Sequence, residues 1–539
     1  MLNKTIKYMK TNIIKYMVGI FAFSAVVFSS CDSLELGPID YYGSTNYWKT
    51  LPQVQTYVNG MHLDLRSNSF NRTFILGEAR GGLQVTGTSS QGVSTYNDVV
   101  KGNTLTGDNT GISGWGGFYG NIFDCNLLIQ QVEGKPLHTE NQKAVDYLLA
   151  QTYSIRALYY FTLYRAYGGV PLVKEVKVLN GSVEQSDLYT PRSTPKQVMD
   201  FIKADITKAF EYFASSGTEW TNNVTWSKAA TQMLAAEVYL WSAKVSLGDQ
   251  VPAATDLATA EGYLTEVKNN TKFGLLDDFA SVFATTNENN KEIIFGINYA
   301  DGEATSNVAN FLYADANIVS FYDANGVKLG DPLNLKGTSI QRYEYTLNFW
   351  NSFNAKDKRR SATFMEYYDK DNVLKGTVLK KFTGSISSTG ARVYDTNEPV
   401  YRYADVLLML AEIENMKGGD PATYINQIRQ RAYGTDYNAV TDAYTNAGFK
   451  ENEYAILAER DKEFVYEGKR WYDVVRMKDA ANGQSLAFDA ASAYGTTSVL
   501  KATETHKLLW PVDKNTLNGD PTLKQTPGYK VADQVEEEW

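Results

Sequence analysis

Residues 145–172 carry the clearest structural signal in the chain: VDYLLAQTYSIRALYYFTLYRAYGGVPL. Apolar residues recur in the first half of this stretch at the spacing of one helix face. Toward Leu163 they occupy every side of the predicted helix, so its second half should be buried. The Gly168-Gly169 pair followed by Pro171 is a typical helix stop. The stretch therefore predicts one long helix whose end lies inside the protein.

More helices are predicted further along the chain. Thr194-Pro195-Lys196-Gln197 combines an N-cap residue, a proline at the first helical position and the glutamine of a capping box. Other predicted helices cover residues 226–244, the segment from Ala404 to Ala411, the segment that starts at Pro421 after the cap Asp420, and residues 452–467. Antiparallel helix pairs joined by short glycine-marked turns predict a mainly α fold with a tetratricopeptide-like scaffold, although no strict repeat of ~34 residues is present.

Two regions interrupt the helical pattern. Residues 66–120 hold 12 of the 41 glycines, and residues 285–395 mix Asn, Gly and aromatics with a strand-like run at 293–297. Long loops on a rigid frame are common positions for binding residues. The predicted organisation of the mature chain is an N-terminal helical scaffold over 41–265 with its loop region at 66–120, an irregular loop-rich region over 266–395, and a C-terminal helical region over 396–539 that closes the scaffold.

Composition excludes several classes of protein. The 539 residues are 43% hydrophobic and 21% charged, which excludes a mostly disordered chain and a polytopic membrane protein. From residue 31 onward, 48 basic residues stand against 61 acidic ones, a net charge of −13, which argues against nucleic acid as a partner. Three His and two Cys, all far apart, argue against a zinc site, a haem attachment or a disulfide scaffold, and we expect no cofactor.

The N-terminus reads as a targeting segment. Four Lys precede an apolar run over residues 17–30, which is too short for a membrane-spanning helix and suits a secretion signal. Small residues directly before Cys31 resemble a bacterial lipobox, in which the signal is removed and the cysteine is acylated. The prediction is a lipoprotein signal peptide over 1–30, a lipidated Cys31 and a polar tether over 31–40; a plain signal peptide with an incidental cysteine is the alternative.

Three carboxylates at helical spacing, Glu459, Glu463 and Glu467, admit two interpretations. They could supply the acid and base of a glycosidase, or they could form structural ion pairs with Arg460, Arg470 and Arg476. One helix face does not place two carboxylates on opposite sides of a substrate, so we favour structural pairing.

Aromatic residues are in excess, with 37 Tyr, 24 Phe and 9 Trp. Several are predicted to lie in loops beside Asn97, Asn298, Gln341 and Asn348; they are Tyr96, Tyr299, Tyr313, Tyr343, Tyr345 and Trp350. A flat apolar ring edged by amide and hydroxyl groups suits a sugar, whose C–H faces lie on the ring while its hydroxyls bond the polar groups. Ordinary loop packing explains any single such residue, but the whole set favours carbohydrate binding.

The chain resembles the SusD-like (RagB/SusD) family of outer-membrane lipoproteins over nearly its whole length. The segments that carry the likeness are Cys31-Asp32-Ser33-Leu34, Tyr47-Trp48-Lys49-Thr50, Leu76-Gly77-Glu78-Ala79-Arg80, Trp115-Gly116-Gly117-Phe118-Tyr119, 156–172, 401–409, 459–473, Trp510-Pro511-Val512 and Gln525-Thr526-Pro527-Gly528-Tyr529. Their order and spacing together make the match specific.

The resemblance implies a SusD-like fold and a non-catalytic glycan-binding lipoprotein. Such a protein would be lipid-anchored in the outer membrane, face the cell exterior, and deliver oligosaccharides to a TonB-dependent SusC-like transporter. Most of the shared motifs are structural in the family, and the ligand site is built from variable loops. Arg80-Gly81-Gly82 departs from the family, where Ser-Asp often follows the arginine.

Three hypotheses follow: a glycan-binding protein, the same fold binding peptides or glycoproteins, and an all-helical glycoside hydrolase. Under the first, aromatic rings would stack on the sugar, asparagines would bond its hydroxyls, and Arg80 would reach a hydroxyl or an acidic group. The residues predicted to contact ligand are Arg80, Tyr96, Asn97, Tyr313, Tyr345, Asn348 and Trp350.

Overall fold

The computed structural model describes residues 47–69, 71–86, 99–112, 114–135, 141–180, 183–310, 316–335, 343–494, 498–531 and 534–539. The chain divides into two units, Met1–Gln53 and Val54–Trp539. In the first unit, the backbone N–H groups of Lys49 and Thr50 donate to the side-chain oxygen of Gln53. The predicted signal peptide, Cys31 and the tether lie outside the described residues.

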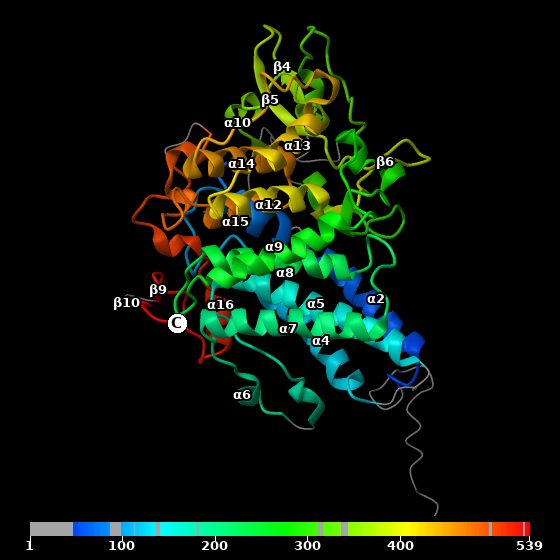
Figure 1. The fold of residues 1–539 in the computed structure, drawn as a ribbon, viewed down its shortest axis with the longest axis vertical. Coiled ribbons are helices and arrows are strands. Elements are labelled where there is room, and N and C mark those ends of the chain that lie inside the picture. The colour runs from blue at the N-terminus through cyan, green and yellow to red at the C-terminus, as the bar shows by residue number, and fades with distance from the viewer. Residues whose placement is uncertain are drawn as a thin grey trace, which may run out of the picture. The chain divides into compact units, whose positions relative to one another are not determined.

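Helices dominate the described part of the chain (Figure 1). They are α2 (Leu51–Ser67), α4 (Gly116–Val132), α5 (Gln142–Tyr167), α6 (Gln185–Leu188), α7 (Pro195–Ser216), α8 (Lys228–Lys244), α9 (Ala254–Asn269), α10 (Leu347–Asn351), α11 (Lys358–Thr363), α12 (Tyr403–Met416), α13 (Ala422–Tyr433), α14 (Phe449–Glu463), α15 (Arg470–Arg476) and α16 (Lys514–Gly519), together with the π-helix η1 (Asn71–Ala79) and several short 3-10 turns. Across the described residues, no helix combines the length and the apolar character that crossing a membrane requires.

The long helix predicted at 145–172 is α5. Every residue from Leu148 to Tyr167 is buried, which confirms the prediction that its second half lies inside the protein. Gly168 ends the helix with a φ of 77°, a left-handed value that a glycine adopts without a steric penalty. Helix α5 packs against α4, α7 and α8, so it forms the centre of this part of the scaffold.

The capping box predicted for α7 is present. The Thr194 hydroxyl accepts the backbone N–H of Gln197, whose side-chain oxygen accepts the N–H of Thr194. Pro195 occupies the first turn, where its missing N–H costs no hydrogen bond. These local signals fix where the helix begins, whereas burial of Ile202, Phe213 and their neighbours fixes which face points inward.

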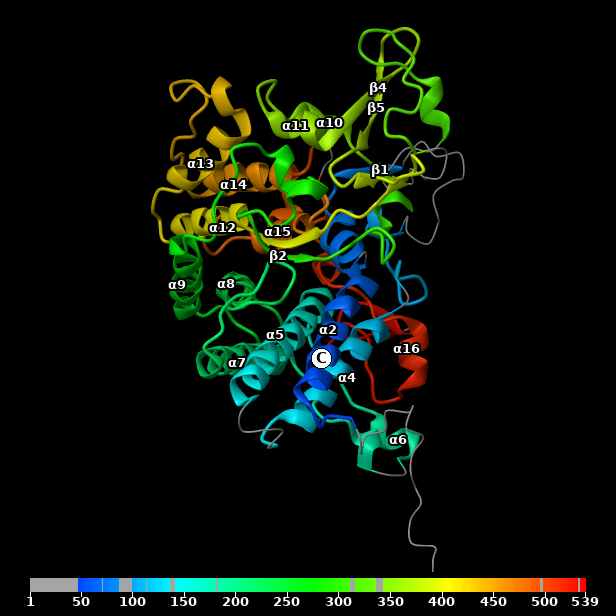
Figure 2. The same cartoon turned by 90° about the vertical axis from the view of Figure 1, so that its right-hand side faces the viewer.

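The helices follow one another as a stack. Helix α7 packs against α5 and α8, α8 against α9, α9 against α12, and α12 against α13 and α14. Figure 2 shows this succession from α7 through α8 and α9 to α12 and α13. The tetratricopeptide-like arrangement predicted from paired helices is therefore the architecture of the scaffold.

One predicted helix has the wrong bounds. The sequence pattern predicted a helix over 452–467, but α14 begins at Phe449 and ends at Glu463. Tyr466 and Gly468 adopt positive φ values of 59° and 71°, so the chain turns there. The buried Glu78 carboxylate accepts the backbone N–H groups of both residues, at 2.9 and 3.4 Å. A hydrogen-bond partner far away in the sequence therefore stabilises the turn that follows the helix.

Strands occur as five two-stranded antiparallel pairs among the described residues: β1 (Gln84–Thr86) with β3 (Tyr343–Tyr345), β2 (Ile293–Ile297) with β8 (Glu398–Arg402), β4 (Phe364–Tyr368) with β5 (Leu374–Leu379), β6 (Ser385–Ile386) with β7 (Arg392–Val393), and β9 (Lys530–Val531) with β10 (Gln534–Val535). The strand predicted at 293–297 is confirmed. The loop contexts predicted for Tyr343, Tyr345 and Trp350 are wrong, because these residues lie in strand β3 and helix α10.

Candidate functional site

Arg80, a predicted ligand contact, lies in the interior. Its side chain is fully buried, and its guanidinium donates to the side-chain oxygen of Asn103 at 2.7 Å and to the backbone carbonyls of Lys507 and Leu509. The guanidinium carbon also lies 4.1 Å from the ring centroid of Trp471. Because every direction around the group is occupied, we place Arg80 out of direct contact with a ligand.

Tyr345 is also enclosed. Its side chain is 2% exposed, and its hydroxyl donates to the carboxylate of Glu78. Burial raises the pKa of Glu78 to about 7, although hydrogen bonds from Tyr345 and from the turn after α14 partly offset this effect. Tyr345 therefore acts as a hydrogen-bond partner inside the fold, and we place it out of direct contact with a ligand too.

Asn348 and Trp350 do reach the surface, on helix α10. Asn348 is exposed, and its side-chain amide lies 3.4 Å from the backbone carbonyl of Tyr494. Trp350 is half-buried, and the guanidinium carbon of Arg360 lies 4.6 Å from its ring centroid. Its indole N–H is buried and has no hydrogen-bond partner among the described residues. Because residues two positions apart leave a helix on different sides, these two side chains offer an amide and a partly open ring at separate points of α10.

Pairing of β1 with β3 brings distant parts of the predicted site together. Gln84 of β1 pairs with Tyr345, and Thr86 pairs with Tyr343. The chain therefore leaves β1 beside the strand that leads into α10. Tyr96, Asn97 and Tyr313 lie outside the described residues, and their contact with ligand stays a prediction.

The three carboxylates of α14 and the turn after it are structural, as favoured from the sequence. Glu459, Glu463 and Glu467 are at most 6% exposed. Glu463 accepts from Arg402 at 3.0 Å and from Arg359 at 3.2 Å. Because such carboxylates are already surrounded by cations and shielded from solvent, they cannot approach a substrate.

The predicted partners of these carboxylates were wrong. Glu459 pairs with Arg359 and Arg429, Glu463 with Arg359, Arg402 and Arg431, and Glu467 with Arg402 and Lys381. Arg460, Arg470 and Arg476 pair instead with Asp473, Asp461 and Glu412. Helical spacing identifies a face, but the tertiary fold supplies the opposing charges from other segments.

These ion pairs set the electrostatics of the interior. Burial alone would raise the pKa of Glu459, but the cations, first Arg359 and then Lys462 and Arg429, lower it to about 2. The pKa of Glu463 is likewise held well below its usual range, because Arg431, Arg402 and Arg359 outweigh its burial. Both carboxylates are therefore charged at neutral pH, which a general acid cannot be.

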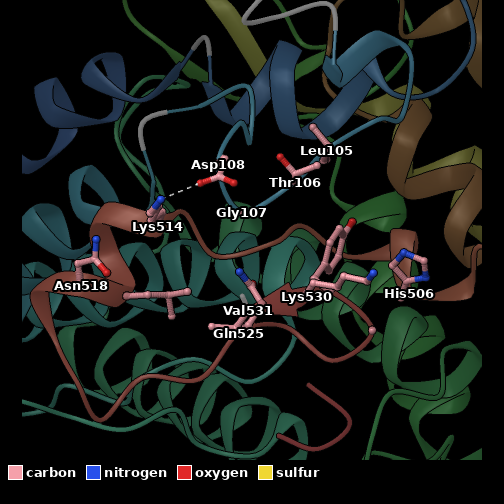
Figure 3. Close-up of a pocket in the computed structure, with 13 residues that line it drawn as sticks. Leu105, Thr106, Gly107, Asp108, His506, Lys514, Asn518, Gln525, Lys530 and Val531 are labelled. Carbon is pink, nitrogen blue, oxygen red and sulfur yellow. Dashed lines mark ion pairs between the residues drawn. The ribbon is translucent and has the colours of Figure 1, made fainter. Parts of the chain in front are cut away.

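A cavity of about 790 Å³ lies between the loop at residues 105–108 and the segment from His506 to Val531 (Figure 3). That volume is in the range of roughly 300–1,000 Å³ that is typical of small-ligand pockets. Leu105, Leu517 and Val531 supply apolar surface. Polar groups surround them, including Thr106, Asp108, Lys514, Asn518 and Lys530.

The wall of this cavity is tightly organised. Gln525 is 1% exposed, and its amide both donates to the carbonyl of Val512 and accepts from that residue's N–H. The Tyr529 hydroxyl donates to the Leu509 carbonyl at 3.0 Å. The ring of His506 meets the Tyr529 ring edge-on, with centroids 5.0 Å apart. The wall is therefore preformed rather than assembled around a ligand.

Sequence reasoning missed this cavity. Trp510-Pro511-Val512 and Gln525-Thr526-Pro527-Gly528-Tyr529 were interpreted only as segments of a family scaffold. The structure shows that the second segment contributes Gln525, Gly528 and Tyr529 to the cavity wall. No periodicity or spacing signals this role, because the opposite wall is about 400 residues earlier in the chain.

Comparisons with known proteins identify the family. A family model described as "SusD family" matches residues 370–529, and one described as "Starch-binding associating with outer membrane" matches residues 50–240. Among solved structures, a SusD superfamily protein from Bacteroides fragilis is 41% identical with a TM-score of 0.84, and the match covers 90% of this chain and 100% of that one.

Two curated relatives extend the likeness. SusD-like protein P38 of Formosa agariphila is 24% identical over 522 residues, covering 93% of this chain and 96% of that protein. Starch-binding protein SusD of Bacteroides thetaiotaomicron is 30% identical over 136 residues, covering 25% of this chain and 22% of that protein. The helical scaffold and the likeness over nearly the full length agree with the resemblance in the sequence motifs. The chain belongs to the SusD superfamily.

Proposed function

We propose that this protein binds oligosaccharides at the cell surface and delivers them to a TonB-dependent SusC-like transporter, without cleaving them. The observation that carries the proposal is membership of the SusD superfamily together with the match to a family model described as starch-binding and associating with the outer membrane. A relative named as a starch-binding protein, SusD, adds support for a glycan as the ligand.

Two surface residues support a sugar ligand. The half-buried ring of Trp350 offers part of an apolar face, and Asn348, two residues earlier on α10, offers an exposed amide. We propose that both contact the glycan, together with Tyr96, Asn97 and Tyr313. Tyr345 is buried two residues before α10 begins and would support this region from inside, whereas buried Arg80 bonds Asn103, Lys507 and Leu509.

The lipid anchor and the transporter are part of the same proposal. Cys31 follows a lipobox-like sequence, and an acylated cysteine would hold the protein at the outer membrane on its exterior face. Mass spectrometry of the protein purified from its native membrane should find acyl chains on Cys31. Copurification of a TonB-dependent barrel from the same membrane would support the partnership, and a protein recovered without acyl modification would contradict the anchor.

Isothermal titration with a panel of oligosaccharides tests the ligand. A ring stacked on a sugar contributes about 0.5–1.5 kcal/mol, so Trp350→Ala should weaken binding about two- to tenfold. Trp220→Ala is the matched control, because Trp220 is 39% exposed and lies outside the proposed site. Equal affinity of the wild type and Trp350→Ala would remove Trp350 from the site.

The same samples separate the alternatives. Chromatography of the recovered oligosaccharides should show them intact, and turnover would favour a hydrolase. Binding to a peptide library without binding to any glycan would favour the peptide or glycoprotein cargo.

A further inference from the structure

The cavity of Figure 3 is lined by more positive than negative charge. Its lining contains two lysines, Lys514 and Lys530, and one carboxylate, Asp108. Asp108 lies 3.3 Å from Lys514, and both side chains are mostly exposed, so solvent screens this pair. Lys530 has no ion-pair partner among the described residues, and Figure 3 shows it extending toward His506.

A further positive charge, that of Arg80, lies directly behind the cavity wall. Arg80 is fully buried and forms no ion pair with a carboxylate of the described residues; its partners are an amide and two backbone carbonyls. One of these carbonyls, that of Leu509, also accepts the hydroxyl of the cavity residue Tyr529. Burial lowers the pKa of Arg80 to about 10, so it stays charged at neutral pH without a counter-charge.

His506 lines the same cavity and lies among these charges. Burial lowers the pKa of His506, and Lys507 and Arg80 lower it further, while Glu504 opposes them. Glu504 itself pairs with Lys507 at 2.8 Å. The charged groups around the ring therefore favour an anion in the cavity, and an anion placed there would reverse the effect on the histidine.

We propose that this cavity binds a saccharide that carries a carboxylate, as a subsite separate from α10. The acidic group would lie near Lys530 and His506, where Arg80 adds a long-range attraction. Leu105, Leu517 and Val531 would meet the C–H faces of the sugar, and Asn518 would bond its hydroxyls.

The chain from residue 31 onward carries 48 basic and 61 acidic residues, so its net charge of −13 repels acidic sugars. A preference for acidic sugars therefore has to come from a local site. This proposal rests on the proposed glycan binding and specifies saccharides that carry a carboxylate as the ligand class.

Paired ligands test the preference. Oligosaccharides of galacturonic, glucuronic, mannuronic and guluronic acid are titrated against neutral oligosaccharides of the same length and linkage. At least one acidic member should bind more tightly than its neutral counterpart, and this advantage should shrink with added salt because salt screens the attraction. Lys530→Gln should reduce the advantage about two- to fivefold, as expected for a partly exposed ion pair, whereas Lys228→Gln, at a partly exposed lysine outside the cavity, should not change it.

NMR of the histidine rings gives a readout independent of affinity. The chain has only three histidines, His62, His138 and His506, and His506→Asn assigns the signal. The preferred acidic ligand should raise the pKa of His506, and the neutral counterpart should leave it unchanged.

The possible results separate the two proposals. Equal or tighter binding of the neutral member in all four pairs, or equal effects of Lys530→Gln and Lys228→Gln, overturns the inference and leaves glycan binding intact. Failure of every saccharide, acidic and neutral, to bind overturns the proposed function.

Discussion

Arg402 and Arg80 are both fully buried arginines, but their surroundings differ. Arg402 donates to Glu292 at 2.7 Å, to Glu463 at 3.0 Å and to Glu467 at 2.7 Å, so carboxylates surround it. Among the residues that the structure describes, Arg80 donates only to neutral oxygens. The pKa of Arg402 is accordingly raised well above its usual value, whereas that of Arg80 is lowered to about 10.

The two arginines have different roles: Arg402 stabilises the fold, and Arg80 adds to the proposed attraction for an acidic ligand. The charges around Arg402 neutralise one another and connect segments that are far apart in the sequence. These charged groups are therefore not available to bind a ligand. The charge of Arg80 is unmatched and lies behind the wall of a 790 Å³ cavity. Charged motifs are therefore informative about binding only when their counter-charges are known.

The largest expected effect is the loss of a buried network partner. Arg402→Met would leave Glu292, Glu463 and Glu467 short of a cation in the interior. Removing one partner of a buried ion pair costs about 3–5 kcal/mol, because the remaining charge is uncompensated. Urea denaturation measures this loss. Glu219→Gln, which breaks an exposed pair with Lys228, should cost less than about 1 kcal/mol, and similar losses in both variants would show that the network is not structural.

Acid should lower the stability of the fold by protonating buried carboxylates such as Glu237. Burial alone would raise the pKa of Glu237, but Arg165, at 2.6 Å, and Lys469 lower it to about 2. The folded-state value lies below the unfolded value of about 4.5, so this group stabilises the fold above pH 4.5 and loses the effect as the pH falls toward 2. The contribution at neutral pH is about 3 kcal/mol. Denaturation midpoints between pH 5 and 2.5 should fall less steeply for Glu237→Gln than for the wild type; parallel curves would contradict the assignment.

Arg80→Met should cost less than Arg402→Met. The substitution leaves no carboxylate without a counter-charge, but it leaves the carbonyls of Lys507 and Leu509 without a donor. An unsatisfied buried polar group costs about 1–3 kcal/mol, and the loss of the buried charge offsets part of this. Denaturation gives the stability, and titration should show a smaller preference for acidic over neutral saccharides. An unchanged preference would rule out the long-range role of Arg80.

The smallest expected loss of stability comes from removing the N-cap hydroxyl of α7. Thr194→Ala removes the acceptor of the Gln197 N–H at the start of α7 and should cost about 1 kcal/mol. Thr194→Ser keeps the hydroxyl and is the matched control. A loss as large as that of Arg402→Met would mean that Thr194 has a tertiary role, for which its hydrogen bond to exposed Asp249 is the obvious candidate.

Local features of the scaffold could be predicted from the sequence. Periodicity identified α5, the capping box identified the start of α7, and an apolar run identified β2. Features that depend on distant partners could not. The turn after α14 is stabilised by Glu78, and the pairing of Glu463 depends on Arg359, Arg402 and Arg431. Both partnerships exist only once the chain has folded.

The same distinction between local patterns and contacts with distant segments applies to the candidate site. The proximity of Asn348 and Trp350 is a local sequence pattern, and the structure leaves Asn348 exposed and Trp350 half-buried; their contact with a ligand stays a prediction. The chemistry of an arginine suits a hydroxyl or an acidic group, but the sequence around Arg80 does not show that Trp471 and Trp510 enclose it. The cavity was missed because its walls meet only in the folded chain.

A crystal structure of the protein with a bound oligosaccharide tests the account most directly. We predict an intact saccharide against α10 or within the cavity of Figure 3, with Glu459, Glu463 and Glu467 still enclosed by their arginines. A cleaved saccharide, or one bound to those three carboxylates, would contradict it.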